Sequence, residues 1–146
     1  MRRAATLICD YAFEASHILR RDDWSAAENE RVFGDCARLH GHSYLLRLHL
    51  RGEVSPEDGM VLNFRDVKAI VERDVLAHLD HRHLNDVLSE LTTAENLCHW
   101  IGRALLPALG DVLARVELWE TRTNAAILTE EDVALLRASL PRATLA

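Results

Sequence analysis

The sequence lacks a long hydrophobic run, an excess of positive charge and a cysteine framework. Its first apolar run is broken at Asp10, which leaves it too short for a signal peptide or a membrane span. The net charge of -6 argues against nucleic acid as a bulk electrostatic partner. The three cysteines are scattered, which fits a reducing compartment. We therefore expect a cytoplasmic protein that binds neither nucleic acid nor a membrane.

The composition is that of an ordinary globular protein. Hydrophobic residues make up 49% and charged residues 27% of 146 positions, which suffices for one domain with a core and is too little for two. We expect a single domain over residues 1–146, with no role assigned to the tail 129–146. Lys68 is the only lysine, so the cations are almost all arginine, which binds carboxylate and phosphate in a bidentate manner. Local recognition of an anion therefore stays possible.

The segment CARLHGH, from Cys36 to His42, suggests metal chemistry. His40 and His42 are two residues apart, so in an extended strand their side chains leave the same face, about 7 Å apart along the backbone. A tetrahedral catalytic zinc takes three protein ligands, most often including histidine, and keeps its fourth position open. Such a pair alone is a weak signal. A third ligand must come from elsewhere, and the best candidate is His17.

Two predicted strands place His17 near this pair. In each strand every second residue is apolar, and a histidine falls at one end of the apolar face. The first face consists of Leu7, Cys9, Tyr11, Phe13, Ala15 and His17, and the second of His42, Tyr44, Leu46, Leu48 and Leu50. If the strands pair antiparallel, the end of the first meets the start of the second, and His17 lies beside His42. Three neutral imidazoles around one cation follow as a hypothesis.

The segments between and after these strands read as helices. Residues 26–34 predict one or two helical turns that end at a glycine and bring Cys36 back to the mouth of the sheet. A longer helix is predicted from an N-cap at Asn63 to about Leu79. The next helix is expected to begin with Thr92 and Glu95, which have the S/T-x-x-E spacing of a capping box.

The remaining segments complete an α+β fold. Period-two spacing returns over residues 112–118, a weaker strand covers 125–128, and a short helix follows from Thr129. The order ββααββ predicts a four-stranded antiparallel sheet with two helices on one face. The third strand then runs in the direction of the first, so Glu120 ends at the same rim as His17 and His42. Two open edges and a bare face favour a homo-oligomer.

Four motifs in this order resemble one known family. They are CxxxHGH at Cys36, LDHxxLN at Leu79, TxEN at Thr93 and a strand ending in ET at Glu120. Together with the upstream His17, they are similar to the 6-pyruvoyltetrahydropterin synthase and 6-carboxytetrahydropterin synthase family. The resemblance covers roughly Leu7 to Leu128. Each motif alone is common, but their combination in this order is highly specific.

The resemblance implies a fold, a cofactor and a set of site residues. It implies the tunnelling fold (T-fold), in which trimers close their sheets into a barrel and commonly stack as hexamers, with active sites between subunits. It implies zinc on the three histidines, catalytic Cys36, Asp80 and His81, a pterin-anchoring Glu120, and 7,8-dihydroneopterin triphosphate as the substrate. Thr93 is expected to contact the ligand through its backbone. Helix capping alone would also explain this threonine.

The residue types suit the implied chemistry. Eliminating triphosphate and rearranging the side chain requires removal of a proton from a carbon beside a polarised oxygen, and zinc with an open position stabilises the charge that develops. A cysteine thiol is mostly protonated at neutral pH, so Cys36 needs a nearby base or cation. His81 with Asp80 is the candidate for that second acid or base, and His83 is its rival. Arg38 is one candidate among several arginines for the triphosphate.

The product and the reaction class leave alternatives open. We favour a 6-carboxytetrahydropterin synthase of queuosine and deazapurine biosynthesis, which releases acetaldehyde and triphosphate. The alternative is a 6-pyruvoyltetrahydropterin synthase, which the segments ENERVFGDC and GMVLN resemble more closely. A zinc hydrolase also uses three histidines but needs a base near the metal in place of a thiol. A pterin-binding or purine-binding module without catalysis is the alternative of another class.

Overall fold

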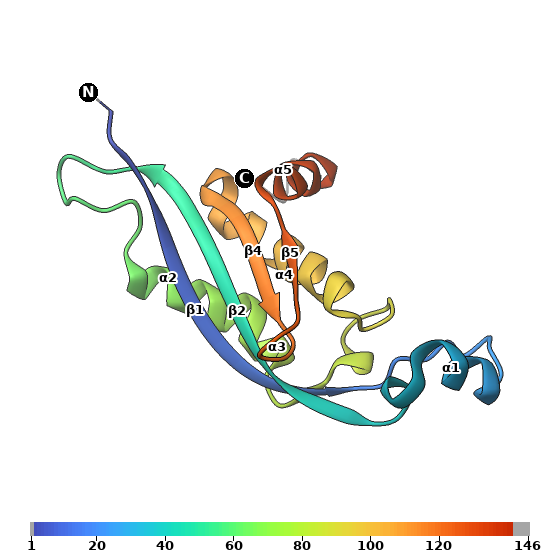
Figure 1. Cartoon of the computed structure of the whole chain (residues 1–146). Helices are drawn as coiled ribbons and strands as arrows, with labels where there is room; N and C mark the ends of the chain where they lie inside the picture. The colour runs from blue at the N-terminus through green and yellow to red at the C-terminus, as the bar shows by residue number, and fades with distance from the viewer. Residues whose placement is uncertain (1, 142–146) are drawn as a thin grey trace.

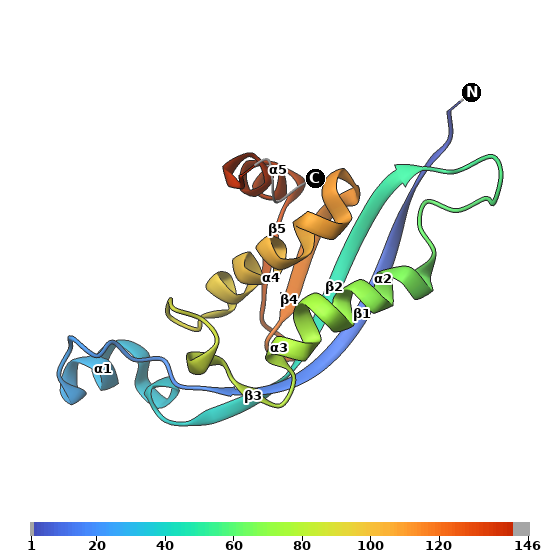
Figure 2. The same cartoon turned by 180° about the vertical axis from the view of Figure 1, so that it is seen from behind.

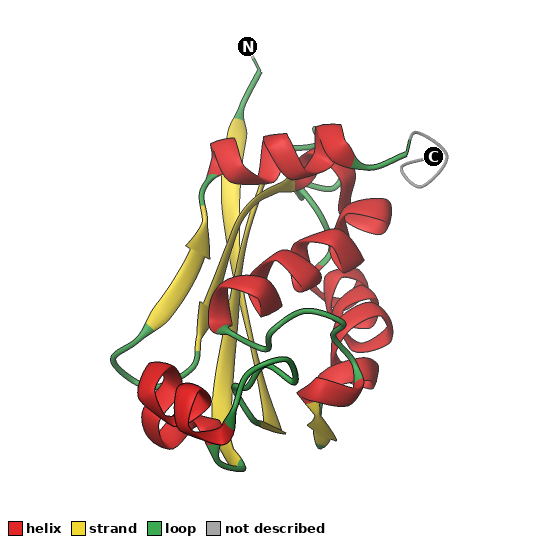
Figure 3. Ribbon diagram, turned by 90° about the vertical axis from the view of Figure 1, so that its right-hand side faces the viewer, coloured by secondary structure: helices red, strands yellow, loops and turns green. Residues whose placement is uncertain are grey.

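A computed structural model of the chain describes residues 2–141 and shows a five-stranded sheet with helices packed against one face (Figure 1, Figure 3). The strands are β1 (Ala4–His17), β2 (His40–Glu53), β3 (Arg82–His83), β4 (Leu113–Trp119) and β5 (Ala125–Leu128). The helices are α1 (Ala26–Phe33), α2 (Phe64–Val71), α3 (Ala77–Leu79), α4 (Ala94–Leu109) and α5 (Glu130–Ser139). Shorter helical segments are η1 (Gly34–Ala37), η2 (Glu72–Leu76), η3 (Leu84–Asp86) and η4 (Gly110–Val112). None of the helices in the described part of the chain is both long and apolar enough to cross a membrane.

The long pair β1 and β2 forms the centre of the sheet. The two strands pair antiparallel along all 14 residues of each, as the alternating pattern predicts. Their predicted apolar faces are buried or, at Leu7 and Tyr11, partly buried; Phe13 and Tyr44, for example, stack with ring centroids 4.9 Å apart. His17 is paired with His40 and lies diagonally beside His42. The three histidines therefore meet at the end of the pair that adjoins α1 (Figure 2).

The prediction of four antiparallel strands was wrong in one respect. A fifth strand, β3, pairs parallel with β1 at Ala15 and Ser16, so the order across the mixed sheet is β3-β1-β2-β4-β5. With two residues, β3 is too short to produce a periodic signal in the sequence. Its position carries the segment that contains Asp80 and His81 to the edge of β1.

Strand β4 departs from strict alternation near its start. The register between β2 and β4 shifts between His49 and Leu50, as at a β-bulge. Leu113 is consequently buried in the core, where simple alternation had predicted Val112 and Ala114. After the bulge, the alternation resumes as predicted.

The helical predictions are confirmed with one shift. Asn63 caps α2 by accepting the Arg65 N–H, and α2 continues through the π-helical η2 into α3. Helix α4 begins one residue later than predicted, because Thr93, and not Thr92, accepts the Asn96 N–H. The two threonines have equivalent spacing to polar residues three positions on, so the sequence could not separate them.

The tail, to which the sequence assigned no role, is part of the core over its described length. Helix α5 begins with a capping box between Thr129 and Asp132 and buries Val133 and Leu136. Gly102 of α4 permits this packing, because a Cβ atom there would lie 2.8 Å from the Leu136 side chain. Residues 142–146 lie outside the described residues.

Candidate metal centre and active site

His17, His40 and His42 form one cluster on the core side of the sheet. One ligand atom from each ring lies within 4.8 Å of the other two. The ring centroids are 4.5 Å apart for His17 and His40, 5.2 Å for His17 and His42, and 5.0 Å for His40 and His42. The predicted convergence of three imidazoles from two strands is therefore present.

Hydrogen bonds fix which nitrogen two of the rings, His17 and His40, present. His17 Nδ1 donates to the Thr92 carbonyl oxygen at 2.8 Å, and His40 Nδ1 donates to the Arg38 carbonyl oxygen at 2.7 Å. A carbonyl oxygen only accepts, so these two rings carry their proton on Nδ1 and a lone pair on Nε2. The Nε2 atoms of all three rings are buried and have no hydrogen-bond partner among the described residues. Three unpartnered Nε2 atoms that converge in this way fit a metal ion, and the set of three histidines fits zinc.

The environment of His17 and His42 favours the neutral form of these two rings. Burial lowers the pKa of His17 to about 4, and the neighbouring His40 and His42 rings act in the same direction. Burial also lowers the pKa of His42, although the Glu120 carboxylate opposes this shift. These imidazoles are therefore uncharged at neutral pH, as metal ligands must be.

Glu120 lies at the rim of the cluster, as predicted. It directly follows β4, where its N–H donates to Asn124, and its Oε1 is 3.6 Å from His42 Nε2. The Glu120 side chain is 24% exposed, so its carboxylate borders both the buried histidines and open space. A carboxylate in this position can accept two hydrogen bonds from a ring N–H and an adjacent amino group.

Cys36 is tied to the segment that follows His17. The thiol is free and exposed, and the Leu19 N–H donates to the Cys36 carbonyl oxygen at 2.8 Å. Helix α1 ends as predicted at Gly34, whose φ of 57° suits glycine, and η1 then carries Cys36 toward β2. No described contact joins the thiol to the three imidazoles, so its catalytic role stays a prediction.

Asp80 and His81 form a pair, and His83 is engaged elsewhere. Asp80 Oδ1 is 2.9 Å from His81 Nδ1, whereas His83 Nδ1 contacts the Ser16 hydroxyl at 3.0 Å. A hydrogen bond from the Glu14 N–H, and then the contact with His81, lower the pKa of Asp80. His81 has a φ of 58° and is the only non-glycine residue in the described chain with a positive φ. Backbone strain of this kind is concentrated at functional sites.

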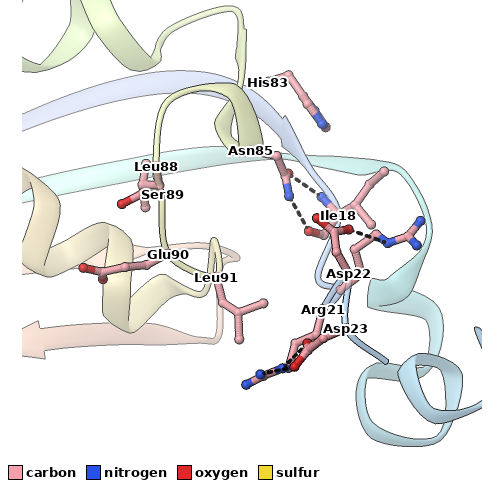
Figure 4. Close-up of a pocket in the computed structure, with 11 residues that line it drawn as sticks. Ile18, Arg21, Asp22, Asp23, His83, Asn85, Leu88, Ser89, Glu90 and Leu91 are labelled. Carbon is pink, nitrogen blue, oxygen red and sulfur yellow. Dashed lines mark hydrogen bonds and ion pairs between the residues drawn. The ribbon is translucent and has the colours of Figure 1, made fainter. Parts of the chain in front are cut away.

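Two pockets adjoin this region. One of about 480 Å³ is lined by His81 and His42 together with Glu14, Ser16 and Ser43, which lie on the face of β1 and β2 opposite to the histidine cluster, and it includes neither His17 nor His40. The other, of about 500 Å³, is shown in Figure 4, where the Asn85 amide bonds both the N–H and the carbonyl oxygen of Ile18. Its two arginines face aspartates, with Arg21 donating to Asp23 at 2.7 Å. The second pocket is therefore poorly suited to a triphosphate.

Comparisons with known proteins agree with this arrangement. The family model for 6-pyruvoyl tetrahydropterin synthase matches residues 6–131. The chain is 36% identical over 135 residues to 6-pyruvoyl tetrahydrobiopterin synthase of Dictyostelium discoideum, covering 90% of this chain and 100% of that one. The chain belongs to the 6-pyruvoyl tetrahydropterin synthase family.

Two further relatives refine the assignment. The 6-carboxy-5,6,7,8-tetrahydropterin synthase of Synechocystis is 37% identical over 122 residues, covering 80% of this chain and 87% of the relative. The solved structure of Caenorhabditis elegans 6-pyruvoyl tetrahydropterin synthase superposes with a TM-score of 0.81 at 31% identity, covering 88% and 98% of the two chains. The predicted T-fold is confirmed, and the 6-pyruvoyl tetrahydropterin synthase family makes this chain a lyase of the pterin synthase type.

Sequence reasoning missed two residues that support the site in this family member. Thr92 was predicted as a helix cap, but it is buried and brings its carbonyl oxygen and its hydroxyl to 2.8 and 3.1 Å from His17 Nδ1. Asn85 was seen only as part of a motif, yet it holds the backbone one residue after His17. The adjacent threonines in TTAEN were the available signal, because only one of them can cap the helix.

The structure also qualifies two predicted ligand contacts. The Arg38 guanidinium donates to Asp35 and Glu30, so it is already neutralised and is a poor candidate for binding triphosphate. Thr93 caps α4, which accounts for its side chain, and the carbonyl of the preceding Thr92 faces His17. A ligand contact of Thr93 stays a prediction.

Proposed function

We propose that the chain is a zinc-dependent lyase that acts on 7,8-dihydroneopterin triphosphate in the cytoplasm. The observation that carries the proposal is the convergence of three buried, unpartnered Nε2 atoms beside the Glu120 carboxylate. Zinc held by His17, His40 and His42 would supply a Lewis acid that polarises an oxygen of the substrate side chain. The residues of the chain supply the remaining steps.

Glu120 would orient the ring. Its carboxylate accepts one hydrogen bond from a ring N–H and one from the exocyclic amino group, each a charge-assisted bond worth about 1.5 to 3 kcal/mol. The side chain of the pterin then extends from Glu120 toward the histidines. Thr93 would add a backbone contact at the same rim.

Cys36 and the Asp80–His81 pair would move protons. The Cys36 thiolate takes a proton from a side-chain carbon, the electron pair left behind forms a carbon–carbon double bond, and the carbon–oxygen bond to triphosphate breaks. Asp80 orients His81, whose exposed ring returns a proton to the carbon skeleton or to the leaving group. Two groups of this kind are needed because the reaction both removes and adds protons.

Two products are compatible with this first half of the reaction. The relative from Synechocystis supports the 6-carboxy product, with release of acetaldehyde and triphosphate, which is the product that we favour. The relative from Dictyostelium favours the 6-pyruvoyl product, which keeps the side-chain carbons. The chain has similar identity to the two relatives, 36% and 37%, so a product assay decides between the two products.

The test is incubation of the zinc-loaded protein with 7,8-dihydroneopterin triphosphate, followed by mass spectrometry. We expect release of triphosphate and one of the two tetrahydropterins, and loss of both in Cys36→Ala with the zinc content unchanged. Turnover that persists in Cys36→Ala would favour a zinc hydrolase. Tight pterin binding with no product from the wild type would favour the non-catalytic module and contradict the lyase.

We also propose a homo-oligomer, a trimer or hexamer with active sites between subunits. One face of the sheet bears no helices, and Ile8 on that side is 56% exposed (Figure 3). Along the edge of β1 that faces away from β2, most residues have no partner strand, because β3 pairs with only two residues of β1. A long unpaired edge favours pairing with another copy of the chain.

A further inference from the structure

The Tyr44 hydroxyl is a buried polar group that the fold itself does not use. Tyr44 is 1% exposed, and its hydroxyl has no hydrogen-bond partner among the described residues. Its ring is held by stacking on Phe13, with an interplanar angle of 10°. A phenylalanine would preserve this packing without leaving a polar atom unsatisfied. The hydroxyl therefore has a cost in the unliganded protein that its surroundings do not offset.

The position of Tyr44 identifies where a partner would come from. Its ring contacts the His42 ring, with centroids 5.6 Å apart. β2 and β4 pair Leu45 with Trp119, so the next step of the same register places Tyr44 opposite Glu120. Tyr44, His42 and Glu120 thus occupy one side of the sheet, with Glu120 3.6 Å from His42.

The hydroxyl can act as a donor there. A phenol O–H is a hydrogen-bond donor, and Tyr44 brings this donor to the side of the sheet on which Glu120 and His42 lie. A ring held by Glu120 through an N–H and an amino group also carries acceptors beside those donors, a carbonyl oxygen on one side and a ring nitrogen on the other. A carboxylate only accepts hydrogen bonds, whereas a phenol can donate one to such an acceptor.

We propose that Tyr44 is a ligand-binding residue whose hydroxyl donates to an acceptor atom of a pterin-type ring held at Glu120. This inference rests on the proposed function, since it requires a ring ligand at the histidine cluster. It assigns the recognition of ring acceptors to Tyr44 and the recognition of ring donors to Glu120.

The test compares Tyr44→Phe with Tyr11→Phe in the zinc-loaded protein, using neopterin as the probe and its fluorescence to measure the dissociation constant. Tyr11 is the only other tyrosine of the chain. It lies on β1, on the same face of the sheet as Tyr44, and is paired with Leu46 of β2. We expect Tyr44→Phe to weaken neopterin binding about three- to tenfold, the effect of one hydrogen bond. Its zinc content should stay unchanged, and its melting temperature without ligand unchanged or higher. Tyr11→Phe should bind like the wild type.

Three outcomes overturn an assignment, each in a distinguishable way. Equal neopterin binding by Tyr44→Phe and the wild type overturns the role of Tyr44 and leaves the lyase standing. Weaker binding together with lost zinc assigns the hydroxyl to the metal cluster and also overturns the ligand contact. A wild type that neither binds neopterin nor turns over 7,8-dihydroneopterin triphosphate overturns the proposed function and this inference together.

Discussion

At the scale of single residues, the histidine cluster shows which features a sequence reveals. The spacing of His40 and His42 and the end position of His17 predict three rings on one face, and the structure confirms their convergence. Their orientation could not be predicted, because it depends on the carbonyl oxygens of Thr92 and Arg38. A backbone carbonyl is present at every position, so no residue type marks the ones that orient a ligand.

Removing one ring should empty the metal centre. In His40→Ala only two imidazoles remain, which is fewer than a catalytic zinc requires, so we expect the zinc content to fall from about one ion per chain to near zero. Elemental analysis of the purified protein measures this directly. His78→Ala is the matched control, because His78 is exposed and packs near Trp100, away from the cluster. A His40→Ala variant that retains a full complement of zinc would contradict the site.

The three thiols should differ in their accessibility. Cys36 is exposed, while Cys9 and Cys98 are buried. We expect iodoacetamide to modify Cys36 first in the folded protein and all three cysteines after unfolding, as counted by mass spectrometry. Activity should fall in step with the first modification, by about 100-fold or more if the thiolate removes a proton in catalysis. Full activity after complete modification of Cys36 would exclude that role.

At the scale of elements, the long periodic segments were predictable and the short or irregular ones were not. β1, β2 and α2 each present several turns or alternations of apolar residues, and their existence followed from the pattern. β3 consists of two residues, and the bulge opposite Leu50 alters the facing of only a few positions in β4. Such features are decided by tertiary contacts, here the pairing of β3 with the end of β1.

The pairing of β1 with β2 includes a cross-strand ion pair that should make stability depend on pH. Arg47 donates two hydrogen bonds to Asp10, at 2.8 and 2.9 Å, and these lower the pKa of the Asp10 carboxyl. A carboxyl with a lowered pKa in the folded state contributes stability above its unfolded pKa of about 3.9 and loses it as the pH falls through the folded value. Both side chains are partly exposed, so the contribution is about 0.2 to 1 kcal/mol.

Asp10→Asn tests that contribution. We expect its unfolding free energy at pH 7 to be lower than that of the wild type by about 0.2 to 1 kcal/mol, with the difference vanishing near pH 2. Urea unfolding over this pH range measures both values, with a chelator present so that zinc release does not contribute. Glu57→Gln serves as the control, since no ion pair of the Glu57 carboxylate occurs in the described residues. A difference that stays constant down to pH 2 would contradict the assignment.

At the scale of the whole molecule, the sheet is covered on one face only. Helices α2 to α5 pack on the core side, and α1 lies beyond the end of the β1–β2 pair (Figure 2). The opposite face carries charged and polar groups such as the Glu117 carboxylate, which His49 contacts at 2.6 Å. The sequence predicted the bare face and the open edges from the count of helices and strands. It could not predict how copies join, because that depends on the shape of an edge formed only in the folded chain.

The proposed assembly makes a direct prediction about size. We expect a solution mass of about three or six times the 16.5 kDa of one chain, measured by light scattering after size exclusion. The reason is the unpaired outer edge of β1, together with the edge strand β5 on the other side of the sheet. The mass should persist on dilution across the range used for activity measurements. A stable 16.5 kDa species with full activity would rule out active sites shared between subunits.

The three histidines of the cluster lie on both sides of the connection from residue 18 to residue 39, with His17 before it and two histidines after it. A metal ion bound to these rings would therefore cross-link the two ends of this long connection, which contains α1 and Cys36. Chelation should loosen this connection before the rest of the sheet unfolds, since the hydrogen bonds that join it to more distant segments of the described chain are those of Asn85 with Ile18, while the bond from the Leu19 N–H to Cys36 lies within it. If the proposed function holds, binding of the metal ion would in this way also position the thiol that removes the proton.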